Sequence, residues 1–167
     1  MPRGLKETSS LIAISSNVTE TAANTFTSQR IDLQLNPLDN EVFIVYAIDL
    51  DLQQPDMVDG VTTEITGSLS TTERTTVGGL NDSNVMAKSR AVIQNDGVNA
   101  VLSEFASDST PTGMLEYIGI IATNDFFLNI KGTNDSNAKA MQARVFGTRA
   151  KADSSVYAAL VQSEVLS

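Results

Sequence analysis

Apolar and polar residues alternate along several short stretches of this chain, and the clearest alternation lies in Phe26–Leu35. Ile31, Leu33 and Leu35 form one row, and Arg30, Asp32 and Gln34 form the other. A period of two residues places one row on a buried face and the other in solvent, as in a half-buried β-strand. The turn-forming residues Asn36–Asn40 follow, with Pro37 inside them.

Glu41–Leu52 is the strongest predicted strand. Its even positions are apolar from beginning to end, whereas its odd positions begin apolar and finish with Asp49 and Asp51. Such a pattern indicates a strand that is covered on both faces at its start and wetted on one face at its end.

Further strands are predicted at Ser9–Ser16, Val61–Thr72, Met114–Thr123, Phe126–Lys131 and Ala138–Ala150. Val85–Gln94 is ambiguous because its apolar residues also fit a helical stripe. Asn95-Asp96-Gly97 follows it, and Asp-Gly between two apolar stretches is a strong hairpin signal. We therefore favour a hairpin that continues into a strand at Val98–Phe105.

The end of the chain predicts a helix at about residues 154–166. Asp153 or Ser154 can cap its first turn through a side-chain oxygen. Its apolar stripe consists of Val156, Tyr157, Leu160, Val161 and Val165. The β domain or a neighbouring molecule must cover that stripe.

Together these elements predict an all-β protein, with about eight strands in an antiparallel sandwich or barrel and one short C-terminal helix. A length of 167 residues suits one domain with its own core.

The charge and the missing residue types limit the chemistry. The net charge is −9 and the eleven basic residues are scattered, which argues against strong nucleic-acid binding. The sequence contains no cysteine and no histidine, so it lacks disulfides, thiolate metal ligands and the commonest general base. We expect no enzyme activity, no catalytic residues and no cofactor. No stretch suits a signal peptide or a membrane span.

Two acidic and three basic residues are the candidate functional groups. Asp49 and Asp51 share one face of a strand, about 7 Å apart, and could supply oxygen ligands to calcium; the alternative is a solvated strand end. Arg144, Arg149 and Lys151 form the only local basic cluster. We expect these basic residues to meet the two aspartates on another copy of the chain, or else to remain solvated.

The tetrapeptide Asn-Asp-Ser-Asn occurs twice, at residues 81–84 and 134–137. Each copy resembles an oxygen-rich calcium loop only superficially, because the glycine and the closing glutamate of an EF-hand are missing. Both copies are therefore predicted to be turns.

The whole arrangement resembles the single jelly-roll capsid proteins of small viruses: a polar N-terminal arm, about eight strands, loops marked by proline and glycine, no cysteine and a small terminal helix. Ala143–Arg149 followed by Asp153–Leu160 is also similar to the ends of coat proteins of uncultured marine prokaryotic viruses. The resemblance implies an arm at residues 1–24 and a jelly-roll domain at 25–167. Many such proteins have an Arg-rich arm that binds the genome, whereas here only Arg3 and Lys6 are present.

The resemblance further implies a structural virion protein that is assembled in the host cytoplasm. Its partners would be copies of itself, in an icosahedral shell, and other virion proteins. The alternative is a phage tail, fibre or decoration protein, or a carbohydrate-binding β-sandwich. A sugar-binding face usually needs exposed aromatic rings, and the absence of tryptophan and the presence of only three tyrosines disfavour it.

Overall fold

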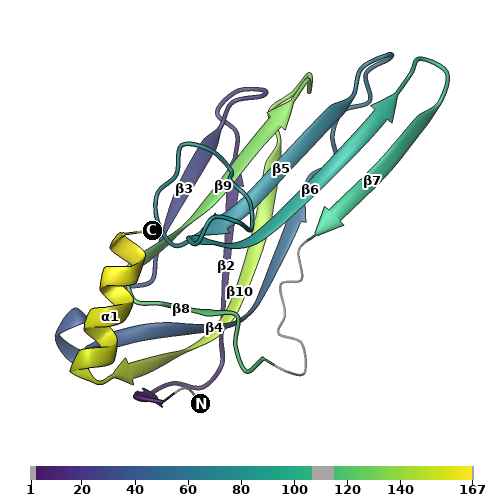
Figure 1. Cartoon of the computed structure of the whole chain (residues 1–167). Helices are drawn as coiled ribbons and strands as arrows, with labels where there is room; N and C mark the ends of the chain where they lie inside the picture. The colour runs from purple at the N-terminus through teal and green to yellow at the C-terminus, as the bar shows by residue number, and fades with distance from the viewer. Residues whose placement is uncertain (1–2, 107–114, 167) are drawn as a thin grey trace.

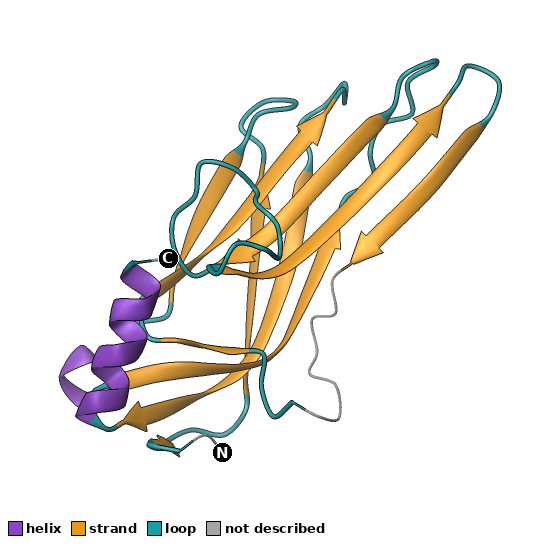
Figure 2. Cartoon of the chain, in the orientation of Figure 1, coloured by secondary structure: helices purple, strands orange, loops and turns teal. Residues whose placement is uncertain are grey.

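Two antiparallel β-sheets pack face to face, with one helix at the C-terminal end, in the computed structural model, which describes residues 3–106 and 115–166 (Figures 1 and 2). The first sheet contains β1 (Leu5–Glu7), β2 (Ile12–Thr19), β4 (Glu41–Leu52), β8 (Gly119–Ile121) and β10 (Ala140–Ala152). The second contains β3 (Thr27–Asp32), β5 (Thr63–Ser70), β6 (Val85–Asn95), β7 (Ala100–Ala106) and β9 (Asp125–Thr133). A short 3-10 helix, η1 (Pro37–Asp39), precedes β4, and α1 (Ser154–Val165) ends the fold. The predicted all-β sandwich with a C-terminal helix is confirmed.

The connectivity is that of a jelly roll. One sheet has the order β2-β10-β4-β8 and the other has the order β3-β9-β5-β6. The chain changes sheet between β2 and β3, β3 and β4, and β4 and β5, and again on each side of β8 and after β9. This crossing pattern produces the two Greek keys of an eight-stranded jelly roll. β1 is added beside β10 and β7 is added beside β6, which brings the described part of the chain to ten strands.

A β-bulge in β4 changes which side chains share a face. Gly147 pairs with Val45, but the preceding residue of β10, Phe146, pairs with Ala47, so Tyr46 is the extra residue. Apolar side chains therefore face the sandwich interior from odd positions before the bulge and from even positions after it. The even row of β4 was predicted to share one face, and this detail is wrong. The predicted change from two covered faces to one wetted face is confirmed, because Asp49 and Asp51 are exposed.

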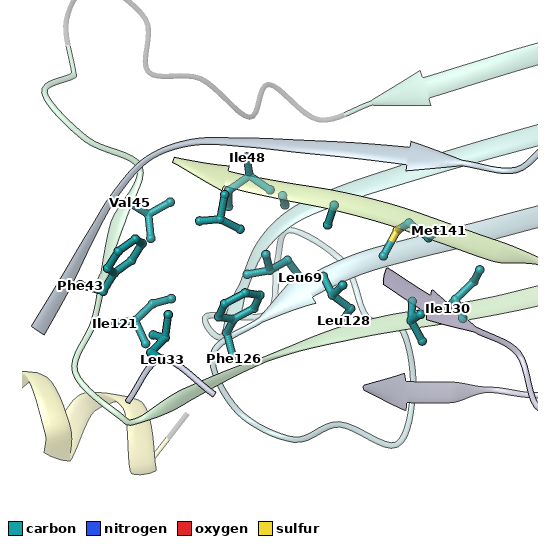
Figure 3. Close-up of a cluster of buried hydrophobic side chains, with 14 of the residues drawn as sticks. Leu33, Phe43, Val45, Ile48, Leu69, Ile121, Phe126, Leu128, Ile130 and Met141 are labelled. Atoms are coloured by element: carbon teal, nitrogen blue, oxygen red, sulfur yellow. The ribbon is translucent and has the colours of Figure 1, made fainter. Parts of the chain in front are cut away.

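The main core lies between the two sheets (Figure 3). Phe43, Ile65, Phe126, Leu128 and Met141 are all at most 1% exposed there. Leu33 and Leu35 also belong to this core, although β3 ends at Asp32 and the backbone turns at Gln34, which has a φ of 53°. Burying each large side chain contributes about 1.5–3 kcal/mol.

A second, smaller core lies between the outer face of the first sheet and α1. Val42 and Ile44 point away from the main core and pack with Val156, Tyr157, Leu160 and Val161 of the helix. The β domain therefore covers the helical stripe, and Asp153 caps the helix by accepting a hydrogen bond from the Val156 N–H at 3.0 Å. The stripe prediction is wrong only for Val165, which is 68% exposed.

The first strands of the chain belong to the sandwich itself. β1 pairs with β10 from Leu5 to Glu7, and β2 pairs with β10 over its whole length. Eleven residues of the segment that was expected as an arm, residues 1–24, therefore lie within the first sheet. β1 is the one strand that the apolar pattern did not predict, because three residues are too few to show a period.

The hairpin prediction at Asn95-Asp96-Gly97 is confirmed. β6 and β7 pair in regular antiparallel register, joined by residues 96–99. Gly97 has a φ of 89°, and Asp96 Oδ1 accepts hydrogen bonds from the N–H groups of Val98 and Asn99. Positive φ and an aspartate that bonds its own turn are the features that favour Asp-Gly at such positions.

Candidate interaction surfaces

The largest exposed apolar side chains on a strand belong to β7. Val101 is 57% exposed, Leu102 is 44% exposed and Phe105 is 52% exposed, and Val98 at the hairpin tip is 89% exposed. We call these four residues the β7 edge. Leu102 pairs across the ladder with Ile93, whereas Val101 and Phe105 pair with Gln94 and Arg90, so both faces of the strand carry apolar groups. Figure 1 shows β7 at the rim of the second sheet.

The backbone of β7 is also open along one side. Within the described residues, β7 pairs with β6 alone. Natural proteins usually protect such an edge with charged side chains, proline or a bulge; the segment Ala100–Ala106 has one charged residue, Glu104, and neither proline nor a bulge. The opposite edge of the same sheet, β3, is protected by the exposed charges of Arg30 and Asp32. The β7 edge therefore favours pairing with another chain more than the β3 edge does.

A polar groove crosses the outward face of the first sheet. It is lined by Ser15, Ser16 and Asn17 of β2, Gln142, Ala143 and Arg144 of β10, and Asp49 and Asp51 of β4. In the ladder Arg144 lies opposite both Asp49 and Ser15, and its Nε donates to Ser15 Oγ at 3.4 Å. Arg144 and the two aspartates, predicted to meet between copies, are thus already neighbours within one chain.

The groove offers oxygen atoms but has no tight cluster of acids. Calcium prefers six to eight oxygen ligands, and here Asp49 and Asp51 supply two carboxylates on an open surface. No group of three or more acidic, histidine or cysteine side chains that could hold a metal ion occurs in residues 3–106 and 115–166. Calcium binding at the two aspartates stays a prediction.

The other two basic candidates have partners inside the chain. Arg149 donates to the carbonyl oxygens of Leu33 at 2.8 Å and Gln34 at 3.2 Å, and it forms an ion pair with Glu41 at 3.2 Å. It therefore ties the end of β3 to β10. Lys151 pairs with Asp39 at 3.0 Å, and both side chains are about half exposed, so this pair contributes little to stability.

Three loops meet at one end of the sandwich through a cluster of charged side chains. Glu20 belongs to the β2–β3 loop, Asp56 to the β4–β5 loop, and Asp135 and Lys139 to the β9–β10 loop. Lys139 Nζ lies 2.6 Å from Asp56 Oδ1, while Asp56 Oδ2 accepts hydrogen bonds from the backbone around Asn137. The hydrogen bond from Lys139 lowers the pKa of Asp56.

Glu20 and Asp135 are the buried carboxylates of this cluster, at 3% and 5% exposure. Glu20 accepts hydrogen bonds from the N–H groups of Gly132 at 2.6 Å and Lys139 at 3.0 Å. Asp135 Oδ1 accepts from the Asp56 N–H at 2.8 Å, but Asp135 Oδ2 has no hydrogen-bond partner. Burial raises the pKa of Asp135. The cluster connects these three loops.

Both Asn-Asp-Ser-Asn segments are turns, as predicted, and each holds a structural network. In the second copy, Asp135 accepts the hydrogen bond from the Asp56 N–H that is described above. In the first copy Asp82 and Asn84 accept hydrogen bonds from Arg74 at 2.9 and 2.6 Å. This network shapes the β5–β6 loop, in which the Val77 carbonyl accepts a hydrogen bond from the buried Ser68 hydroxyl, so the loop covers the outer face of the second sheet.

Sequence reasoning missed the β7 edge as a functional feature. The strand was predicted, but the apolar residues of the segment Ala100–Phe105 occur at both odd and even positions, and a strand of that kind is usually buried on both faces. That both faces are nevertheless exposed depends on tertiary structure, which the local pattern does not encode.

The fold and these surfaces define an all-β jelly-roll protein with an open apolar edge. No protein-family model matches the chain, and no curated protein matches it. Among solved structures, it is similar to a tailspike protein, gp49, from Acinetobacter baumannii bacteriophage Fri1, described as a capsular polysaccharide depolymerase. The identity is 11%, the match covers 79% of this chain and 19% of that chain, and the TM-score is 0.18. This chain thus spans about a fifth of that protein, and so slight a likeness carries no argument about function.

No helix in the described ranges is both long enough and apolar enough to cross a membrane.

Proposed function

We propose that this protein is a structural virion protein, a jelly-roll subunit that assembles with copies of itself into an icosahedral shell. Jelly rolls occur in viral capsids but also in lectins and cupins, so the fold alone does not decide the function. The observation that carries the proposal is the β7 edge. An exposed apolar strand with free backbone groups favours pairing with another protein, and a soluble monomer gains nothing from it.

The net negative charge of the chain is consistent with a shell whose subunits do not bind a genome tightly. With twenty acidic and eleven basic residues, the surface would repel phosphates. In the described part of the N-terminal segment, Arg3 and Lys6 are the basic residues, and β1 holds that segment against β10. We infer that copies of this chain and other virion proteins are the partners, without strong nucleic-acid binding.

The test is assembly of the purified protein. We expect closed particles by negative-stain electron microscopy and a large species by light scattering. The variant Val101→Lys/Phe105→Glu places charges on the β7 edge. We expect this variant to assemble only at a concentration at least about tenfold higher than the parent requires. Gln29→Lys, on the charged β3 edge, is the matched control and should assemble like the parent. Circular dichroism should show that both variants are folded. A parent protein that stays monomeric at high concentration would refute the proposal.

One observation favours a second candidate, a phage tail, fibre or decoration protein or a carbohydrate-binding module. The groove around Asp49, Asp51 and Arg144 presents hydroxyl, amide and charged groups, and such groups can hydrogen-bond a sugar. Its lining contains no aromatic side chain, although aromatic faces usually stack on sugar rings. Titration calorimetry with a panel of soluble glycans distinguishes the two functions. The module is favoured if the parent protein forms no particles and binds a glycan, and if the variant Asp49→Asn loses that binding.

A further inference from the structure

We infer that β7 pairs antiparallel with β7 of a second copy across a two-fold axis at Ser103, joining the two second sheets into one continuous sheet. This inference rests on the proposed function and deepens it by naming one contact between subunits. It follows from the edge of β7, which pairs with no other strand of the described residues than β6, from the residues that this edge presents and from its single charge.

The backbone of β7 is arranged for this pairing. The Asp96 N–H donates to the Asn99 carbonyl at 3.1 Å, so the residue pair that closes the hairpin is hydrogen-bonded. Hydrogen-bonded and non-hydrogen-bonded pairs alternate along an antiparallel ladder, and the β6–β7 register is regular from there. Ser103 consequently bonds toward β6, whereas Leu102 and Glu104 direct their N–H and C=O groups toward the open side. These two residues would form the new ladder.

The charge of the strand limits the register. Within the described residues of β7, Ala100–Ala106, an axis at Ser103 places each residue opposite a residue of the second copy. The strand has a single charged residue, Glu104. With the axis at Ser103, Glu104 lies opposite Leu102 of the second copy, whereas an axis one residue later would place the two Glu104 carboxylates face to face.

The same register also matches the side chains on the outer face. Phe105 would lie opposite Val101 of the second copy, which covers two of the exposed groups of the β7 edge. The Arg90 guanidinium already lies 4.7 Å from the centre of the Phe105 ring and holds it in place. An apolar strand edge of this kind fits a second copy of itself better than it fits the β3 edge, whose exposed residues include Arg30 and Asp32.

The contact is small by itself. Seven residues span about 24 Å of strand, and one strand pair buries far less than the roughly 1,600 Å² of a standard interface. We therefore expect a weak isolated dimer that becomes stable when further contacts in a closed shell add to it. A covalent trap is a suitable assay for such a contact, and the absence of natural cysteine gives it a clean background.

The experiment uses single-cysteine variants of the full chain under mild oxidation. Ser103 of the two copies would form a non-hydrogen-bonded pair with Cα atoms about 4.5 Å apart, which suits a disulfide. We expect Ser103→Cys to form a covalent dimer at least tenfold faster than Gln29→Cys on the β3 edge. We also expect a mixture of Val101→Cys and Phe105→Cys to crosslink faster than either variant alone, because these positions face each other across the axis.

The outcomes separate the pairing from the shell. Particles without a Ser103→Cys crosslink would refute the pairing and leave the shell proposal intact. A crosslink without particles under any condition would support the pairing and count against the shell. A mixed dimer of Ser103→Cys with Gln29→Cys, formed faster than the Ser103→Cys homodimer, would show a head-to-tail contact between β7 and β3 and would overturn the two-fold axis.

Discussion

Lys139 and Asp56 belong to two different loops, and the Lys139 ammonium lies 2.6 Å from Asp56 Oδ1. The lysine side chain is only 5% exposed, whereas the aspartate side chain is 24% exposed. Removing either member would leave a charge at a site with little access to water, which is costly. This pair therefore joins the β4–β5 loop to the β9–β10 loop at the end of the sandwich.

We predict that Asp56→Asn destabilises the protein at pH 7 by about 3 kcal/mol, because Lys139 loses its counter-charge. The pKa of Asp56 is lowered by the hydrogen bond from Lys139. Its contribution is therefore fully present above the unfolded value near 3.8 and is lost as the pH falls through the lower folded value. Urea unfolding at pH 7 and pH 3 should show the parent and the variant converging in acid. Asp59→Asn, an exposed aspartate of the same loop, should match the parent at both pH values.

Asp135 should behave in the opposite way. Burial raises its pKa, so its contribution to stability is fully present below the unfolded value near 3.8 and is lost as the pH rises through the folded value. We predict that Asp135→Asn is at least as stable as the parent at pH 7, because the amide oxygen can still accept from the Asp56 N–H. Asp135→Ala leaves that N–H unpaired and should cost about 2 kcal/mol. Thermal unfolding at pH 7 checks both; an asparagine variant as unstable as the alanine variant would contradict the prediction.

Most strands could be predicted because their buried rows repeat every second residue. β4 has the predicted bounds, and β10, predicted as a strand, presents Met141, Ala143 and Val145 inward. The bulge at Tyr46 could not be predicted, because residues on both sides of it are apolar at odd and even positions alike. The first half of β4 has two apolar faces because α1 covers its outer face.

The candidate surfaces were less predictable than the fold. Arg144, Asp49 and Asp51 share the outward face of the first sheet, but they do so because β10 lies between β2 and β4, an order that no local pattern encodes. Arg149 was grouped with Arg144 by its position in the chain. The odd and even positions of β10 point to opposite faces, so Arg149 instead lies against the end of β3.

Gly147 should tolerate no side chain. A Cβ atom at this position would lie 2.3 Å from the Ile44 carbonyl oxygen and 2.5 Å from the Phe43 ring. The bulge in β4 brings its backbone this close to β10. We predict that Gly147→Ala lowers the free energy of unfolding by about 3 kcal/mol or more, measured by urea denaturation. Gly79→Ala is the control, since its Cβ would mainly meet the movable Asn81 side chain, and equal losses in the two variants would contradict this explanation.

Glu164 replaces the predicted Val165 as the last helical side chain that the domain buries. Its carboxylate accepts hydrogen bonds from the N–H groups of Ala122 at 2.5 Å and Thr123 at 2.9 Å, and from the Thr123 hydroxyl at 2.6 Å. It thereby fixes α1 to the turn between β8 and β9, where two backbone donors would otherwise be buried without partners.

We therefore predict that Glu164→Ala costs about 2–4 kcal/mol, since each unpaired buried donor costs about 1–3 kcal/mol. Glu164→Gln should recover part of the loss, because its amide oxygen can accept one of these hydrogen bonds. Gln162→Ala, on the exposed side of the helix, should leave the midpoint of urea unfolding unchanged. Hydrogen exchange should also show faster exchange of the Ala122 and Thr123 amides in Glu164→Ala. If both amides stay protected in that variant, the carboxylate is not what holds the turn.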